Sequence, residues 1–168
     1  VGGSASEGAD RQSLSLDGAC KVKSLDGKVM PCDANDDEQN KLVASVAKAN
    51  PRTIVVASVP GAFLLPWVHD VEAALVNFMP GQQAGNAIAD VLFGKVNPSA
   101  KLPITLPNKE NEISFEAGQY PGEKRKDQLT HSVYSEQLLV GYRYYEEHAI
   151  RFDTGFPFGH GLSYTNFE

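Results

Sequence analysis

Residues 53–58 read Thr-Ile-Val-Val-Ala-Ser, a β-branched run that is apolar on both faces of an extended chain. Such a run is typical of a strand buried in a parallel sheet. The preceding residues, 36–50, carry one apolar stripe at helical spacing and acidic residues at their start, and Pro51 ends the pattern. Asn35 or Asp36 is the expected N-cap of this helix. A helix followed by a buried strand predicts an α/β fold.

The chain after this strand continues the same alternation. Residues 71–78, VEAALVNF, are predicted to form a second buried strand. Residues 82–93 have a helical pattern, and Gly94 stands where a glycine commonly ends a helix. Residues 102–106 read as a short strand at the sheet edge, because Pro103 has no N–H to donate.

Three later segments complete the expected fold. Residues 107–135 are charged and irregular, and an irregular stretch of this length in a compact domain is often functional. Residues 138–145, LLVGYRYY, are predicted to form a strand, and residues 156–161, FPFGHG, a tight aromatic–glycine corner. We therefore predict a layered α/β sandwich with a mostly parallel sheet and helices on both faces.

Length and charge restrict the class of protein. The 168 residues fit a single domain, so we assign 1–168 to one α/β unit. The net charge of -6 argues against nucleic acid or an anionic membrane surface as the main partner. No run approaches the roughly 18 consecutive apolar residues of a membrane span. The opening Val1-Gly2-Gly3 resembles the end of a strand, so we expect a fragment whose N-terminal part is missing.

The two cysteines, Cys20 and Cys32, flank a segment rich in Lys, Gly and Asp. Their spacing is too wide for a CxxC redox motif, and no second pair exists for a zinc site. A disulfide that closes a surface hairpin is the favoured interpretation, and two free cysteines are the alternative. A disulfide would indicate an oxidising compartment, with the protein secreted or periplasmic.

Common catalytic motifs are absent from the sequence. It has no P-loop, no GxGxxG and no GxSxG. His69, Asp70 and Glu72 are the nearest approach to a ligand cluster, and we predict neither a metal nor a cofactor. Carboxylate chemistry is the enzyme class that remains. The stretch SASEGADR at 4–11 carries Glu7, which alone reads either as an exposed acidic loop or as a catalytic carboxyl delivered on a loop.

Three separated motifs resemble those of one family. They are FMPGQQAGNAIADVLFGKVNPSAKLP at 78–103, VGYRYY at 140–145 and FPFGHGLSYT at 156–165. On these motifs the chain resembles the C-terminal α/β-sandwich domain of glycoside hydrolase family 3, of the β-glucosidase type. The motifs occur in the family's order and cover nearly the whole chain.

The resemblance implies specific roles. Members of the family pair a barrel domain, which holds a nucleophilic Asp, with a sandwich domain that supplies a Glu in an EGxDR-type loop. Glu7 is therefore the candidate acid/base, and Asp10 and Arg11 are candidates for bracing its loop. A retaining glycosidase needs two carboxyls about 5–5.5 Å apart, and 168 residues cannot hold a barrel of about 250. We expect the nucleophile outside this chain, and the chain alone to be inactive.

The family also implies a reaction class. The resemblance suggests a retaining exo-β-glycosidase. The first expectation is a β-glucosidase that removes terminal non-reducing β-D-glucosyl residues, as in cellulose degradation. The expected partners are a β-glucoside or short oligosaccharide and an N-terminal barrel domain in the same polypeptide or a separate chain. The alternatives are a β-xylosidase or arabinosidase of the same family and a non-catalytic carbohydrate-binding or scaffolding domain. A flavodoxin-like nucleotide-binding domain also fits the α/β pattern but lacks a phosphate loop.

Overall fold

The structure, a computed structural model, describes residues 1–5, 7–8, 11, 13–17, 24–25, 28–29 and 37–166. In chain order the elements are β1 (Ser24–Leu25), β2 (Lys28–Val29), α1 (Glu38–Ala49), β3 (Ile54–Ser58), the 3-10 helix η2 (Val68–Asp70), β4 (Ala73–Asn77), α2 (Ala84–Leu92), β5 (Glu123–Lys124), β6 (Thr130–His131) and α3 (Tyr142–Glu147).

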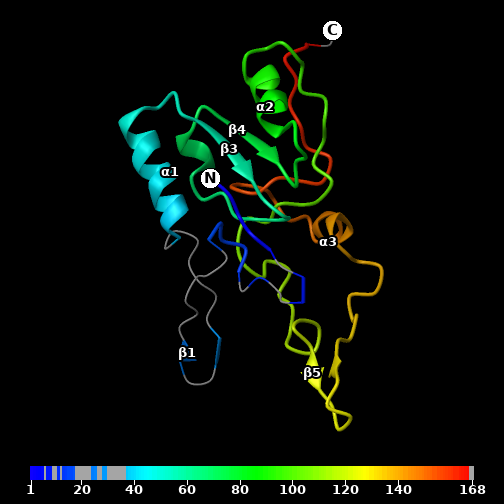
Figure 1. The fold of residues 1–168 in the computed structure, drawn as a ribbon. Helices are drawn as coiled ribbons and strands as arrows, with labels where there is room; N and C mark the ends of the chain where they lie inside the picture. Colours follow the sequence, from blue (N-terminus) through cyan, green and yellow to red (C-terminus); the bar gives the residue numbers. More distant parts are fainter. Residues whose placement is uncertain are drawn as a thin grey trace.

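The centre of the fold is the parallel pair β3 and β4 (Figure 1). Their register runs from Ile54 opposite Ala73 to Ser58 opposite Asn77. Both predicted strands, 53–58 and 71–78, are thus confirmed, as is their parallel direction. The first residues of the chain lie on the other edge of β3, where Ser58 accepts from Gly3 N at 2.9 Å.

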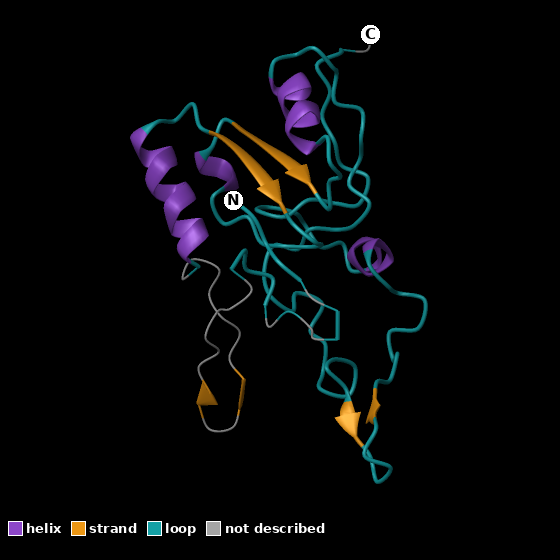
Figure 2. Ribbon diagram, in the orientation of Figure 1, coloured by secondary structure: helices purple, strands orange, loops and turns teal. Residues whose placement is uncertain are grey.

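Two helices flank this pair, α1 and α2, as Figure 2 shows. The predicted helix at 36–50 is confirmed as α1, but its N-cap is Asp37, whose side chain accepts from Asn40 N at 3.0 Å. The predicted helix at 82–93 is confirmed as α2, and Gly94 follows it at a φ of +72°. Of the helices described, none is long and apolar enough to cross a bilayer.

A single apolar cluster joins α1, β3 and the segment after β3. Alternate residues of β3, Val55 and Ala57, face this cluster and are almost fully buried. Trp67 is 2% exposed, and its indole N–H donates to Asn40 Oδ1 of α1 at 2.7 Å. The cluster consists of Leu16, Val43, Val55, Ala57, Val59, Phe63, Leu65, Trp67 and Leu106.

The predicted strand at 102–106 is wrong in its extent. Leu106 forms an isolated antiparallel bridge with Phe156, and Leu102 hydrogen-bonds His160 and Gly159 without forming a strand. Beyond this bridge the side-chain oxygen of Asn108 accepts from the backbone N–H of Asp153 at 2.7 Å and of Gly155 at 3.0 Å. A side chain that takes backbone donors in this way competes with a strand ladder, so the pairing ends at Leu106. Before Leu106, Pro103 has no N–H to donate to a ladder.

The predicted strand at 138–145 is also wrong, because its second half is the helix α3. Gly141, at a φ of +58°, separates the helix from the apolar residues before it, of which Leu138 is 82% exposed. Tyr145 is buried on α3, and its hydroxyl donates to Glu112 Oε2 at 2.9 Å. This tertiary contact outweighs the strand propensity of an aromatic-rich segment. The irregular segment 107–135 contains one short hairpin, β5 paired antiparallel with β6.

Candidate active site

Glu7 lies on a loop at the carboxyl edge of the parallel sheet. Gly2 forms a parallel bridge with Ser58, the last residue of β3, and the chain then continues past the end of the strand toward Glu7. The Glu7 side chain is exposed, and Gly8 has a φ of +81°, which favours glycine. Ligands of open parallel α/β sheets bind outside this edge. The loop therefore presents a carboxyl group where a ligand or another domain can meet it.

The chain before this loop is held by α1. The side-chain amide of Gln39 contacts Gly2 twice: it accepts from Gly2 N at 2.8 Å and donates to Gly2 O at 2.7 Å. A Cβ on Gly2 would lie 3.1 Å from Ser58 O, so glycine permits the close approach to β3. Gly2 is thus fixed both to α1 and to β3.

The chain after the loop is held by Arg11. Its guanidinium donates to Ala62 O at 2.8 Å and to Ser15 O at 3.1 Å. Burial lowers the pKa of Arg11, and the neighbouring Glu110 carboxylate partly offsets that effect. The contact with Ala62 joins the Glu7 loop to the segment that follows β3. The bracing role of Arg11 in catalysis stays a prediction.

Glu110 provides a second contact to the same stretch. Its Oε1 accepts a hydrogen bond from Leu14 N, although the two residues lie 96 positions apart. The carbonyl of Leu14 accepts from Leu64 N at 3.0 Å, so both backbone groups of Leu14 are engaged. Burial raises the pKa of the Glu110 carboxyl, while the Leu14 N–H and the charge of Arg11 act in the opposite direction.

The segment that carries Glu110 is itself fixed by Asn108 and Glu112. The Glu112 carboxylate accepts from Asn108 N at 3.0 Å and from Asn108 Nδ2 at 2.7 Å. It also accepts from the Tyr145 hydroxyl of α3. Burial and the Glu112 carboxylate raise the pKa of Tyr145, so this hydroxyl keeps its proton and remains a donor. Glu110 therefore projects from a segment held on both sides.

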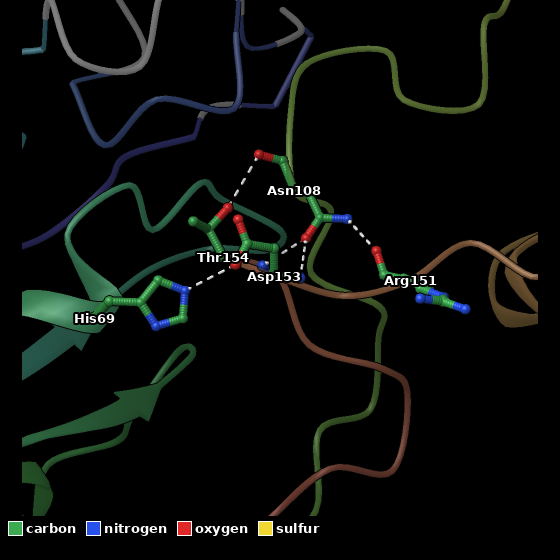
Figure 3. A network of polar contacts seen from close by, with 6 residues as sticks. His69, Asn108, Arg151, Asp153 and Thr154 are labelled. Atoms are coloured by element: carbon green, nitrogen blue, oxygen red, sulfur yellow. Dashed lines mark hydrogen bonds and ion pairs between the residues drawn. The ribbon is translucent and has the colours of Figure 1, made fainter.

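Asn108 connects this segment to residues 151–155, as Figure 3 shows. Its side chain donates to Arg151 O at 3.1 Å and accepts from Asp153 N, and its carbonyl accepts from Thr154 Oγ1 at 3.3 Å. His69 reaches the same group through Asp153 Oδ1 at 3.0 Å. Residues 108–112 thus contact residues 151–155 through Asn108 and the N-terminal stretch through Glu110, while His69 of η2 contacts Asp153.

A pocket of about 390 Å³ lies beside α3. Tyr145 and Phe152 stack on one side of it, with ring centroids 5.3 Å apart. Tyr142 and Phe158 stack with ring centroids 4.8 Å apart, and both side chains are exposed. The described Glu7 side chain does not line this pocket.

Three predicted residues, Asp10, Cys20 and Cys32, lie outside the described residues. The antiparallel hairpin of β1 and β2 falls between the two cysteines in the sequence. The predicted disulfide and the role of Asp10 in the loop stay predictions.

His69, from the nearest approach to a ligand cluster in the sequence, contacts an acidic residue outside that cluster. His69 pairs with Asp153. Among the described residues, no three His, Cys, Asp or Glu side chains are grouped so that they could hold a metal ion.

Sequence reasoning missed Gln39 and Glu110. The length and charge of the irregular segment 107–135 pointed to function there, but no pattern singled out Glu110 within it. Gln39 carries no sequence signal, because a glutamine in the first turn of a helix is ordinary. Both act through backbone groups distant in sequence, which only the folded chain brings together.

The chain is similar to known glycoside hydrolases. The family described as "Glycosyl hydrolase family 3 C-terminal domain" matches residues 1–164. The chain is 44% identical over 138 residues to "Beta-glucosidase B" of Emericella nidulans, covering 79% of this chain and 16% of that protein. It is 42% identical over 136 residues to "Thermostable beta-glucosidase B" of Acetivibrio thermocellus, covering 79% of this chain and 16% of that protein.

Solved structures agree with these relatives. A β-glucosidase from Streptomyces venezuelae in complex with D-glucose superposes with a TM-score of 0.75 at 38% identity, over 95% of this chain and 17% of that chain. A β-glucosidase from Kluyveromyces marxianus in complex with glucose gives a TM-score of 0.70 at 34% identity, over 96% and 16%. The chain thus spans only 16–17% of the length of these relatives.

Proposed function

The chain belongs to the C-terminal domain family of glycosyl hydrolase family 3, and on that premise we propose that it is the acid/base-carrying domain of a retaining β-glucosidase, with Glu7 as the acid/base. The observation that carries the proposal is the position of Glu7, exposed on a loop at the carboxyl edge of the parallel sheet. The loop is tied to Gln39 before Glu7 and to Arg11 after it. A general acid must be both accessible and held in a defined position, and this arrangement supports such a role.

The proposed reaction has two steps with balanced proton transfers. In the first, a carboxylate on another domain attacks the anomeric carbon, and the Glu7 carboxyl gives its proton to the departing glycosidic oxygen. In the second, the Glu7 carboxylate takes a proton from water, whose oxygen attacks the same carbon and releases the nucleophile. The sugar leaves with its original anomeric configuration, and Glu7 is again protonated.

The nucleophile is proposed to lie on a barrel domain outside this chain. The relatives are about six times longer than the matched part, which leaves room for such a domain. Several large apolar side chains are exposed here, and another domain could cover them. Four of them are Met79 at 80%, Phe93 at 87%, Leu138 at 82% and Leu162 at 77% exposed.

The proposed substrate is a β-glucoside or a short β-linked glucose oligosaccharide. The names of the relatives favour glucose over the xylose or arabinose that other members of the family accept. The rates of the full-length enzyme on matched aryl β-glucoside, β-xyloside and α-arabinoside substrates test this choice. A kcat/KM for the xyloside or arabinoside above that for the glucoside would overturn it.

The acid/base role is tested with Glu7→Gln in the full-length enzyme that carries this chain. General acid catalysis contributes about 10²–10⁴-fold, so kcat/KM on cellobiose should fall by that factor. With 2,4-dinitrophenyl β-glucoside, whose leaving group needs no proton, it should stay within a few-fold of the parent value. Glu72→Gln is the matched control, because this exposed carboxyl precedes β4 at the opposite edge of the sheet. Equal losses on both substrates would refute the proposal.

A secreted or periplasmic location also remains a proposal, and it depends on the pairing of Cys20 with Cys32. The intact mass of the protein after alkylation, with and without prior reduction, decides between a disulfide and two thiols. A protein with the disulfide gains no alkyl groups before reduction and two after it, whereas a protein with two free thiols gains two in both cases.

A further inference from the structure

Glu110 is a partly buried carboxylate that the reaction proposed above does not use. Its Oε1 accepts from Leu14 N, three residues after Arg11. Burial raises the pKa of this carboxyl, and the fold keeps it in place through a backbone donor and the positive charge of Arg11. A partly buried acid with two such partners connects the segment 107–112 to the end of the Glu7 loop.

Arg11 belongs to the same connection. Its guanidinium donates to Ala62 O and Ser15 O and interacts electrostatically with Glu110. Arg11 and Leu14 are therefore bonded to the segment after β3, Leu14 is also bonded to Glu110, and Arg11 is also bonded to Ser15. The hydroxyls of Ser13 and Ser15, 2.8 Å apart and buried, add a further contact within this stretch.

The short distance along the chain makes this connection relevant to Glu7. Four peptide units separate Glu7 from Arg11, and an extended chain of that length spans at most about 14 Å. On the other side four units separate Glu7 from Gly3, which β3 holds through Ser58 O. Gly3 and Arg11 therefore limit how far Glu7 can move, and a shift of Arg11 changes the space that is open to Glu7.

We propose that Glu110, acting with Arg11, is a positioning residue for the acid/base carboxyl of Glu7, an inference that rests on the function proposed above. Glu110 does not touch the substrate. Glu110 fixes the chain after the Glu7 loop through Arg11 and Leu14. The hydrogen bonds of Asn108 and Glu112 fix the segment that carries Glu110. Catalytic groups need placement to within about 0.5 Å, which an exposed loop alone does not provide.

The test compares leaving groups in the full-length enzyme. Because kcat/KM reports steps up to cleavage of the glycosidic bond, a displaced acid lowers it only where the departing oxygen needs a proton. Glu110→Ala should lower kcat/KM on cellobiose about 10- to 100-fold and leave the value on 2,4-dinitrophenyl β-glucoside within about 3-fold. A purely structural role would lower both values together, in proportion to the folded fraction.

Two further variants complete the test. Glu110→Gln keeps an oxygen that can accept from Leu14 N, so it should recover most of the loss on cellobiose, and it decides the question if Glu110→Ala does not fold. Glu116→Ala removes an exposed carboxyl from the same irregular segment and should change neither value. Equal losses on both substrates for the Glu110 variants, or no loss on either, would overturn the inference.

The failure of this inference can be told apart from that of the proposed function. If Glu7→Gln shows the leaving-group difference and the Glu110 variants do not, only the positioning role is wrong. If Glu7→Gln itself shows no such difference, Glu7 is not the acid/base and both are wrong.

Discussion

At the scale of single residues, Asp37 and Asp17 form a reciprocal cap at the start of α1. The Asp37 carboxylate accepts from Asn40 N at 3.0 Å and from Asp17 N at 2.6 Å, while Asp17 Oδ2 accepts from Glu38 N at 2.9 Å. Burial opposes the charge of Asp17, but hydrogen bonds from Gln39 and Glu38 leave its pKa below the ordinary value. The first turn of α1 therefore depends on two carboxylates rather than one.

Asp37→Ala should lower the free energy of unfolding by about 1–2 kcal/mol, because it removes the N-cap acceptor of α1. Urea unfolding followed by the fluorescence of Trp67, the only tryptophan, measures the change. Glu38→Ala, in the same turn, is the control: its ion pair with Lys41 is exposed and contributes less than about 0.5 kcal/mol. Equal effects of the two substitutions would contradict the cap.

The raised pKa of Glu110 predicts a pH dependence of stability. Between its ordinary value of 4.5 and its higher folded-state value, the folded chain keeps a proton that the unfolded chain has released. The free energy of unfolding should therefore fall as the pH rises through this window, and level off above it. Arg11, the charged group that faces Glu110, stays protonated throughout.

Glu110→Gln lacks this titration, so subtracting its unfolding free energy from that of the parent isolates the Glu110 contribution. Urea unfolding of both proteins from pH 4 to pH 8 measures the difference. The unfolding free energy of the parent minus that of Glu110→Gln should decrease as the pH rises from about 4.5. A difference that rises with pH, or stays constant, would show that burial does not disfavour the charged carboxyl.

At the scale of elements, the pairing of Leu106 with Phe156 requires Gly155. A Cβ at this position would meet Leu106 O and lie 2.8 Å from the carbonyl carbon of Pro107, both backbone atoms. Gly155→Ala should therefore force the two segments apart and lower the free energy of unfolding by about 1–3 kcal/mol.

Gly85 in α2 gives the opposite expectation. Apart from its chain neighbours and the backbone of its own helix, no atom lies within 4 Å of a Cβ placed there, and its φ is not positive. Gly85→Ala should raise the free energy of unfolding by about 0.5–1 kcal/mol, since alanine favours the helix interior. The same urea unfolding experiment compares the two substitutions. A stabilising Gly155→Ala would refute the close approach at the bridge.

The outcome of the sequence predictions differs between regular and irregular parts. The strand at 53–58 and the helices at 36–50 and 82–93 follow from local periodicity, and the structure has all three. The segment at 138–145 misled because its aromatic residues favour strands, while Gly141 and the contact of Tyr145 with Glu112 impose a helix. Local patterns carry no information on partners that lie far away in the sequence.

The residues of the candidate site likewise fall into those that the sequence predicts and those that it does not. The EGxDR-type loop was recognisable from its motif, so Glu7 and Arg11 could be singled out. Gln39 and Glu110 could not, because each acts on a backbone group 37 or 96 positions away. Their contacts exist only once α1 and the irregular segment have folded against the N-terminal residues.

At the scale of the whole molecule, the proposed function divides the reaction between two domains. The purified 168-residue chain should hydrolyse no aryl β-glucoside, because the carboxylate that attacks the anomeric carbon is expected elsewhere. Release of 4-nitrophenol by this chain, compared with the full-length enzyme at equal concentration, checks the prediction. Hydrolysis that Glu7→Gln abolishes would mean that the chain holds a complete active site.

The most direct test of the central claim uses the full-length enzyme with the substitution Glu7→Ala. The measurement is the sugar product that it forms from 2,4-dinitrophenyl β-glucoside in the presence of azide. Without a general base, water attacks the glycosyl-enzyme slowly, whereas azide needs no proton removed and displaces the enzyme carboxylate directly. The account predicts faster turnover with azide and accumulation of β-glucosyl azide. Turnover that azide does not change, with glucose as the only sugar product, would contradict the assignment of Glu7 as the acid/base.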